Sequence, residues 1–164
     1  MTSPQSHVEE GKKLTADALV DLWEITLVGT ASPVTLYLTN GPSVTWQTND
    51  YEGDKALKMS TYSRDSDGKV SRPTLMLQNP FGLYNDAAHK GYFDGAGVIR
   101  RRVLRQHIVS NTNISQTEFW YIGKVKELIS NQFINFELRA PSDGPEQQIP
   151  ARKFIPPDFP FVKF

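Results

Sequence analysis

The stretch SRPTLMLQNPFG, residues 71–82, is the best-bounded strand candidate in the chain. Its apolar centre, residues 74–77, suits a pleated and largely buried strand. Asn79-Pro80 ends the strand, because the residue before a proline is held extended and proline cannot donate the next ladder hydrogen bond. Gly82 then lets the chain turn. The sequence therefore predicts a short strand that stops abruptly, followed by a helical turn or two within residues 83–88.

Segments with strand-like composition come before this stretch. Residues 17–27 alternate between a strongly apolar parity and a mixed one, as in a sheet with one face in a core. The Asn40-Gly41 pair favours positive φ angles, so it predicts a tight hairpin that joins residues 34–39 to residues 43–47. Residues 56–62 predict one more strand.

The same composition continues after the stretch. Just before the stretch, residues 64–68 predict a hairpin loop that leads into the opening strand. After it, residues 98–110 predict a long strand. Residues 119–129 and 132–138 predict a hairpin across Ser130-Asn131. The sum is about eight short strands with one or two short helices. We therefore expect a mainly β fold, an antiparallel barrel or sandwich.

The end of the chain differs in character. Six of the 11 prolines follow Ala140, which excludes regular ladders and predicts an extended proline-rich tail. Apolar residues such as Phe154 and Ile155 lie between these prolines and predict that the tail docks on a neighbour. The predicted organisation is a barrel-like domain over residues 1–140 and a docking tail over residues 141–164.

Composition excludes several classes of protein. The 164 residues carry 18 basic and 18 acidic side chains, and a dedicated nucleic-acid binder usually has a basic excess. There is no cysteine, so disulfides, thiolate metal sites and a cysteine nucleophile are excluded. No window approaches the roughly 18 consecutive apolar residues of a membrane span. The polar start lacks the apolar centre of a signal peptide.

No motif predicts catalysis or metal binding. His7, His89 and His107 lie far apart in the sequence without metal-ligand spacing, and no G-x-S-x-G elbow occurs. The alternating carboxylates around Gly53 lack the bidentate glutamate that closes a calcium loop, so we interpret them as solvated turn residues. We predict no catalytic, metal-binding or cofactor-binding residue.

The most notable charged feature is the run Arg100, Arg101, Arg102 and Arg105. In a strand, Arg100 and Arg102 share one face, and Arg101 and Arg105 share the other. One interpretation is a barrel rim or a subunit interface at which guanidinium groups meet carboxylates. The other is a solvated edge strand that charge protects against aggregation. A nucleic-acid groove is less favoured, because the rest of the composition does not support it.

Several stretches, in this order, resemble those of a known family. They are LWEI at residues 22–25, VTWQ at 44–47 with YEG soon after, SRPTLMLQNPFG at 71–82, GAGVIRRRVL from Gly95, FINFELRAPSDGP from Phe133, and IPARKF after it. From about Ala18 to Phe154, the chain resembles the amino-terminal domain of the minor tail protein L family of lambda-like long-tailed phages.

The resemblance implies a non-enzymatic structural role in the virion. Such a protein lies at the tail tip, in the hub or baseplate region, and joins the distal tail tube to the central hub or fibre protein. The implied partners are further copies of itself in a trimer, the distal tail protein, the hub or tip fibre protein and the tape-measure protein, with assembly in the host cytoplasm. Longer relatives carry an iron–sulfur cluster, which we do not expect here because cysteine is absent.

Arg72 and Phe81 flank the opening strand, where a barrel presents its rims. With the arginine run and the tail aromatics they give our predicted interface residues: Arg72, Phe81, Arg100, Arg101, Arg102, Phe159, Phe161 and Phe164. Two alternatives stay open. One is a cell-wall-directed enzyme of the tail tip, in which His89, His107 or Asp94 would carry the activity. The other is a small ligand-binding β-barrel.

Overall fold

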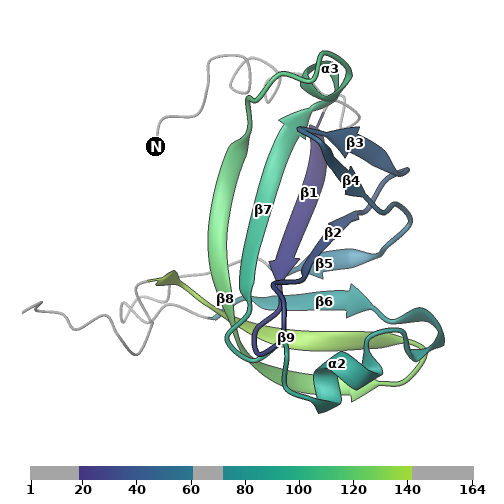
Figure 1. Ribbon diagram of the computed structural model, residues 1–164, viewed down its shortest axis with the longest axis vertical. Helices are drawn as coiled ribbons and strands as arrows, with labels where there is room; N and C mark the ends of the chain where they lie inside the picture. The colour runs from purple at the N-terminus through teal and green to yellow at the C-terminus, as the bar shows by residue number, and fades with distance from the viewer. Residues whose placement is uncertain (1–18, 61–71, 142–164) are drawn as a thin grey trace, which may run out of the picture.

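The computed structural model describes residues 19–60 and 72–141 (Figure 1). The predicted loop at residues 64–68 and the tail residues 142–164 lie outside the described residues. The main sheet has seven strands in the order β2-β1-β7-β8-β9-β6-β5, and every neighbouring pair is antiparallel. These strands are β1 (Leu19–Thr26), β2 (Thr35–Thr39), β5 (Leu57–Met59), β6 (Thr74–Gln78), β7 (Gly97–Leu104), β8 (Gln116–Ile129) and β9 (Phe133–Arg139).

A small second sheet and three short helical segments complete the described fold. The second sheet pairs β3 (Val44–Trp46) with β4 (Asn49–Tyr51). The helical segments are η2 (Pro80–Gly82), α2 (Asn85–His89) and α3 (Arg105–Val109). In Figure 1 the main sheet curls into a half-barrel, with β1 and β7 upright and β6 and β9 running across below them. The predicted mainly β, antiparallel architecture is confirmed.

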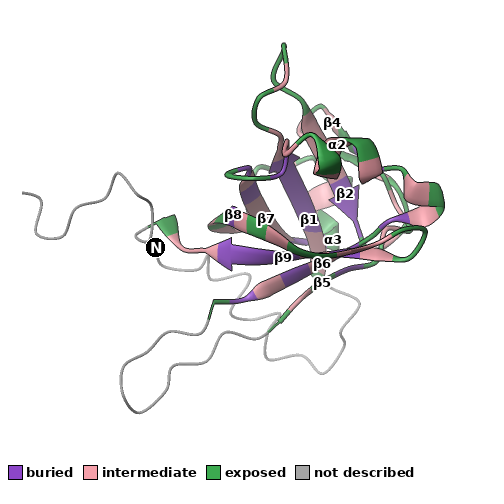
Figure 2. Ribbon diagram, turned by 90° about the horizontal axis from the view of Figure 1, so that it is seen from below, coloured by how far each residue is buried: buried purple, intermediate pink, exposed green. Residues whose placement is uncertain are grey.

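Apolar side chains pack on both faces of β1, whose central residues 22–25 are all buried. Trp23 and Ile25 point into the curl, where they join Leu75 and Phe136 in the larger core. Leu22, of the opposite parity, packs on the other face in a second cluster that the β3–β4 hairpin covers. Figure 2 shows the same pattern, with buried residues along β1 and β9. Each such side chain stabilises the fold by about 1.5–3 kcal/mol.

The opening strand and the late hairpin form as predicted. Residues 74–78 form β6, and both Leu75 and Leu77 are fully buried. β8 and β9 pair across Ser130-Asn131, where Asn131 has a positive φ of 64°. The helical turns predicted after Gly82 appear as α2.

The predicted hairpin at Asn40-Gly41 is wrong. β3 pairs with β4 instead of β2, across a turn at Gln47 and Thr48 with φ angles of 50° and 68°. Neither Asn40 nor Gly41 has a positive φ. Burial explains the difference, because this hairpin places Trp46 and Tyr51 on the outer face of β1.

The predicted long strand at residues 98–110 is wrong in its second half. β7 ends at Leu104, and residues 105–109 form α3. Ile108 then packs into the second cluster. The loop after α3 is also held by the hairpin, since the Trp46 Nε1–H donates to the Thr112 carbonyl at 3.2 Å. These contacts favour a chain that turns back over one that continues as a strand.

Candidate functional site

A buried asparagine fixes the loop after β6. Asn79 has no exposed surface. Its side-chain oxygen accepts the Tyr84 N–H at 2.9 Å, and its Nδ2 donates to the Asn85 Oδ1 at 2.7 Å. Its own N–H donates to the Gln132 carbonyl at 2.9 Å. A buried amide whose oxygen and nitrogen both form hydrogen bonds favours one geometry, so these bonds fix the path of the loop that carries Phe81.

Phe81 projects from that loop. Phe81 is 98% exposed, and its backbone lies in the left-handed region at φ 56°, ψ 18°. A non-glycine residue there costs about 1–3 kcal/mol, and such strain gathers at binding sites. Leu83, two residues later, is 61% exposed. We name these two side chains the Phe81 knob. Its exposed apolar surface and the strained backbone of Phe81 together indicate a contact surface.

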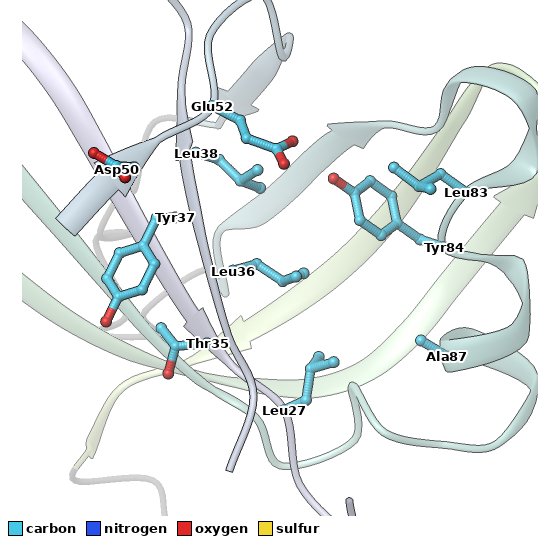
Figure 3. Close-up of a pocket in the computed structure, with 10 residues that line it drawn as sticks. All are labelled: Leu27, Thr35, Leu36, Tyr37, Leu38, Asp50, Glu52, Leu83, Tyr84 and Ala87. Carbon is cyan, nitrogen blue, oxygen red and sulfur yellow. The ribbon is translucent and has the colours of Figure 1, made fainter. Parts of the chain in front are cut away.

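A groove opens beside the knob, between the outer edge of β2 and α2 (Figure 3). Its volume is about 410 Å³. Leu27, Leu36 and Ala87 form its apolar part, while Glu52 and the Tyr84 hydroxyl approach one another at its far end. Burial, and next the charge of Glu52, raises the pKa of Tyr84 above its ordinary value. The groove therefore combines an apolar pocket with an acidic end.

The arginine run lies on β7, a central strand between β1 and β8. Arg100 Nη2 lies 2.7 Å from Asp21 Oδ2, and Arg102 Nε lies 3.5 Å from Asp21 Oδ1. Glu118 on β8 lies 3.6 Å from Arg100 and 4.0 Å from Arg102. The Arg100 guanidinium also lies 5.1 Å from the Trp23 ring centroid, a cation–π contact. These side chains link three strands on one face.

Arg101 points to the opposite face. Its Nε donates to Glu24 Oε1 at 2.7 Å, and the Tyr51 hydroxyl donates to the same oxygen at 2.7 Å. Glu24 is 9% exposed, so its charge is compensated within the protein. Burial first, and then the hydrogen bond to Glu24, raises the pKa of Tyr51 well above its ordinary value. The network ties β4 to the sheet.

The prediction that Arg100 and Arg102 lie on one face of the strand and Arg101 on the other is confirmed. The prediction for Arg105 is wrong, because Arg105 lies in α3. The edge-strand interpretation is also wrong, because β7 has a neighbour on each side. The described carboxylate partners come from the same chain. An additional interface role for Arg100, Arg101 and Arg102 stays a prediction.

Arg72 lies at the entrance of β6, as expected. Its Nη1 donates to Glu137 Oε1 at 2.8 Å, and its side chain is 48% exposed. This hydrogen bond holds the pKa of Glu137 below its ordinary value. An interface role for Arg72 stays a prediction. The predicted interface residues Phe159, Phe161 and Phe164 lie outside the described residues.

The described residues do not assemble the alternative catalytic set. His89 lies in α2 and Asp94 in the turn after it, whereas His107 lies in α3 at the opposite end of the sheet (Figure 1). Within residues 19–60 and 72–141, no group of three or more His, Asp or Glu side chains could hold a metal ion. In the same ranges, no helix is long and apolar enough to cross a membrane.

Sequence reasoning missed the buried role of Asn79 and the groove at β2. The position of Asn79, directly between a buried strand and a proline, was the one available signal. The groove has no local signature, because it joins side chains that lie up to 60 positions apart, from Leu27 to Ala87.

Comparison with known protein families gives a match. A family model described as phage minor tail protein L matches residues 35–163, well over half of the chain. No curated protein sequence matches the chain. The matched range includes β2 to β9, the Phe81 knob and the arginine strand. The chain therefore belongs to the phage minor tail protein L family.

Proposed function

We propose that this protein is a structural component of the phage tail tip, in the hub or baseplate region, where it joins the distal tail tube to the central hub or fibre protein. It acts by assembly and without catalysis. It is a trimer around the tail axis, contacts the distal tail protein, the hub or tip fibre protein and the tape-measure protein, and assembles in the host cytoplasm. Family membership supports a structural role in the phage tail.

The observation that carries this proposal is the Phe81 knob. Phe81 is 98% exposed, so its side chain buries almost no surface within its own subunit, and its left-handed backbone is maintained against a steric cost. The buried Asn79 amide holds the loop in that strained position. A rigid apolar side chain held out from the surface is the kind of anchor that fills a pocket on a partner. The neutral charge of the chain further suits a protein that packs among other proteins.

The test replaces Phe81 with asparagine, which is polar and tolerates the left-handed region. Phage that lack this gene are complemented with the wild-type protein, with Phe81→Asn or with Val109→Ser. Val109, 84% exposed on α3, is the matched control for an exposed apolar residue. We expect Phe81→Asn to fold normally but to be missing from purified virions, with a loss of plaque titre. Incorporation of Phe81→Asn at wild-type copy number would contradict the knob's role.

The position in the tail needs a separate measurement. An epitope tag on the chain, labelled with antibody and viewed by electron microscopy, should mark only the distal tip of the tail. Label along the whole tube would refute the tail-tip assignment while leaving the role of Phe81 in assembly intact. Native mass spectrometry of the released tip complex counts the copies of the chain, and a number other than three would overturn the trimer.

A further inference from the structure

Asn40 and Gly41 form the one Asn-Gly pair of the sequence, and they lie where the two edge strands of the main sheet meet. The Asn40 Nδ2 donates to the Leu57 carbonyl at 2.9 Å, and the Asn40 Oδ1 accepts the Leu57 N–H at 2.8 Å. Beside them, the Lys55 N–H donates to the Thr39 carbonyl at 3.3 Å. We name these contacts the β2–β5 junction.

The backbone of Gly41 is held in place as well. Its N–H donates to the Thr39 Oγ1 at 3.4 Å, and its carbonyl accepts the Asp54 N–H at 2.9 Å. Gly53 packs directly against it, since a Cβ on Gly53 would lie 2.7 Å from the Gly41 oxygen. The closed junction therefore fixes both the side-chain amide of Asn40 and the peptide nitrogen that follows it.

An asparagine followed by glycine is prone to spontaneous deamidation, because glycine has no Cβ to hinder the approach of its nitrogen to the asparagine side chain. The surroundings of Asn40 leave room for this reaction once the amide is released. Asn40 is exposed to solvent. Apart from its chain neighbours, no atom of the described residues lies within 4 Å of a Cβ built on Gly41. The junction, and not burial, therefore opposes the reaction.

We propose that Asn40 is a deamidation site that the β2–β5 junction protects, so that the amide is lost only when the junction opens. Ring closure expels Nδ2, the donor to Leu57, and takes the Gly41 N–H away from Thr39. It cannot proceed while these bonds are intact. Breaking two ordinary hydrogen bonds leaves an open fraction of less than about one in ten.

The reaction needs only water. The Gly41 nitrogen gives up its proton and bonds to Asn40 Cγ, while the Cγ–Nδ2 bond breaks and Nδ2 leaves with that proton as ammonia. Water then adds to one carbonyl carbon of the cyclic imide and breaks its bond to the Gly41 nitrogen, which takes up a proton. Attack at Cγ gives aspartate, and attack at the main-chain carbon gives isoaspartate.

The product cannot close the junction again. Ionised aspartate and isoaspartate have no side-chain N–H for the Leu57 carbonyl, and a carboxylate oxygen beside that carbonyl repels it. Isoaspartate also lengthens the main chain, which displaces Gly41 from Thr39 and Asp54. A modified subunit therefore has less protected edges at β2 and β5, and open edges are prone to pairing with other chains.

Peptide mapping by mass spectrometry tests the proposal on the purified full-length protein in mildly alkaline buffer. We expect Asn40 to deamidate at least about tenfold more slowly in the folded protein than in the same protein unfolded in urea. Equal rates in the folded and unfolded protein, or no reaction of Asn40 in urea, would overturn the proposal.

Gly41→Ala is the matched control. Gly41 has no positive φ and its Cβ position faces open space, so this variant should fold like the wild type. Its added Cβ hinders ring closure, so Asn40 should deamidate more slowly in urea than in the wild-type chain. A Gly41→Ala chain that deamidates in urea as fast as the wild type would contradict attack by the Gly41 nitrogen.

Amide hydrogen exchange shows whether opening of the junction controls the reaction. The same opening releases the Leu57 N–H, so its protection against exchange should equal the protection of Asn40 against deamidation within about threefold. The N–H of Phe136, a fully buried core residue, reports unfolding of the whole domain and should be at least about tenfold better protected. Equal protection of Leu57 and Phe136, or deamidation that follows Phe136 as urea is raised, would refute the junction's role.

The deamidated protein tests the predicted effect of the product. Its added negative charge separates it from the unmodified protein by ion exchange. Its Leu57 N–H should exchange at least about tenfold faster than in unmodified protein, and Gly41→Ala incubated for the same time should keep slow exchange. Unchanged Leu57 exchange after deamidation would show that the product still closes the junction. These readouts use purified protein, so their failure is distinct from a failure of Phe81 in virions.

Discussion

The side-chain amide of Asn40 and the backbone of Leu57 exchange two hydrogen bonds. Asn40 Nδ2 donates to the Leu57 carbonyl at 2.9 Å, and the Leu57 N–H donates to Asn40 Oδ1 at 2.8 Å. Asn40 follows β2 and Leu57 begins β5, which are the two edge strands of the seven-stranded sheet. One amide thus imitates a backbone pair and joins the edges at one end of the curl.

Removing this amide should destabilise the fold. Asn40→Ala leaves the N–H and C=O of Leu57, a 5% exposed residue, without their partner. We expect a loss of about 2–3 kcal/mol in the free energy of unfolding, measured by urea titration. Asn40→Asp keeps only the acceptor oxygen, so its free energy of unfolding should lie between those of the wild type and Asn40→Ala. The exposed Asn113→Ala is the control, and a wild-type midpoint for Asn40→Ala would show that the edges do not depend on this contact.

The contacts of Asn40 also explain why the hairpin predicted from the sequence at Asn40-Gly41 does not form. Asn40-Gly41 predicted a hairpin from local turn preference, but the side chain bonds to a residue 17 positions away. Long-range side-chain pairing of this kind has no local signature. The opening strand was predictable because its boundaries are local: an apolar run, then Asn-Pro, then Gly.

The exposed site was predictable only in part. Phe81 was placed at a rim, yet its left-handed backbone follows from the burial of Asn79, which the sequence does not reveal. The facing of the arginines followed from strand periodicity, whereas the identity of Asp21 and Glu24 as their partners required the register of β1 against β7. Strand periodicity can be derived from neighbouring residues, whereas the register of two strands depends on residues far apart in the sequence.

Arg101 should matter more to stability than Arg105, the last arginine of the run. Arg101→Met leaves Glu24, with a side chain only 11% exposed, without its cation. We expect a loss of about 2–3 kcal/mol, below the range for fully buried pairs because the Arg101 side chain is 27% exposed. Arg105→Met, on the exposed surface of α3, should change stability by less than about 0.5 kcal/mol. Equal effects in thermal unfolding would contradict the network.

Tyr51 should make the protein sensitive to alkaline pH. Its folded pKa is raised above the ordinary value of 10.0, chiefly by burial. The buried, protonated Tyr51 hydroxyl therefore makes its full contribution to the free energy of unfolding below pH 10. Above pH 10 this contribution is progressively lost, because the unfolded state releases the proton while the folded state keeps it. Relative to Tyr51→Phe, the wild type should lose about 1.4 kcal/mol per pH unit above that point. Parallel stability curves for the two proteins between pH 9 and pH 11 would refute the assignment.

Arg72 and Leu75 separate the rim of the opening strand from its interior. Leu75→Asp places a charge at a fully buried site and should unfold the domain. Arg72→Ala removes the half-exposed partner of Glu137, so the variant should remain folded, with a free energy of unfolding about 1 kcal/mol lower at neutral pH.

The pKa of Glu137 is lowered chiefly by the hydrogen bond to Arg72. This stabilisation is present above pH 4.5 and is lost as pH falls through the folded pKa. The difference between wild type and Arg72→Ala should therefore shrink in acid, as followed by circular dichroism in urea. A difference that stays constant from pH 7 to pH 3 would mean that Arg72 stabilises the strand by packing alone.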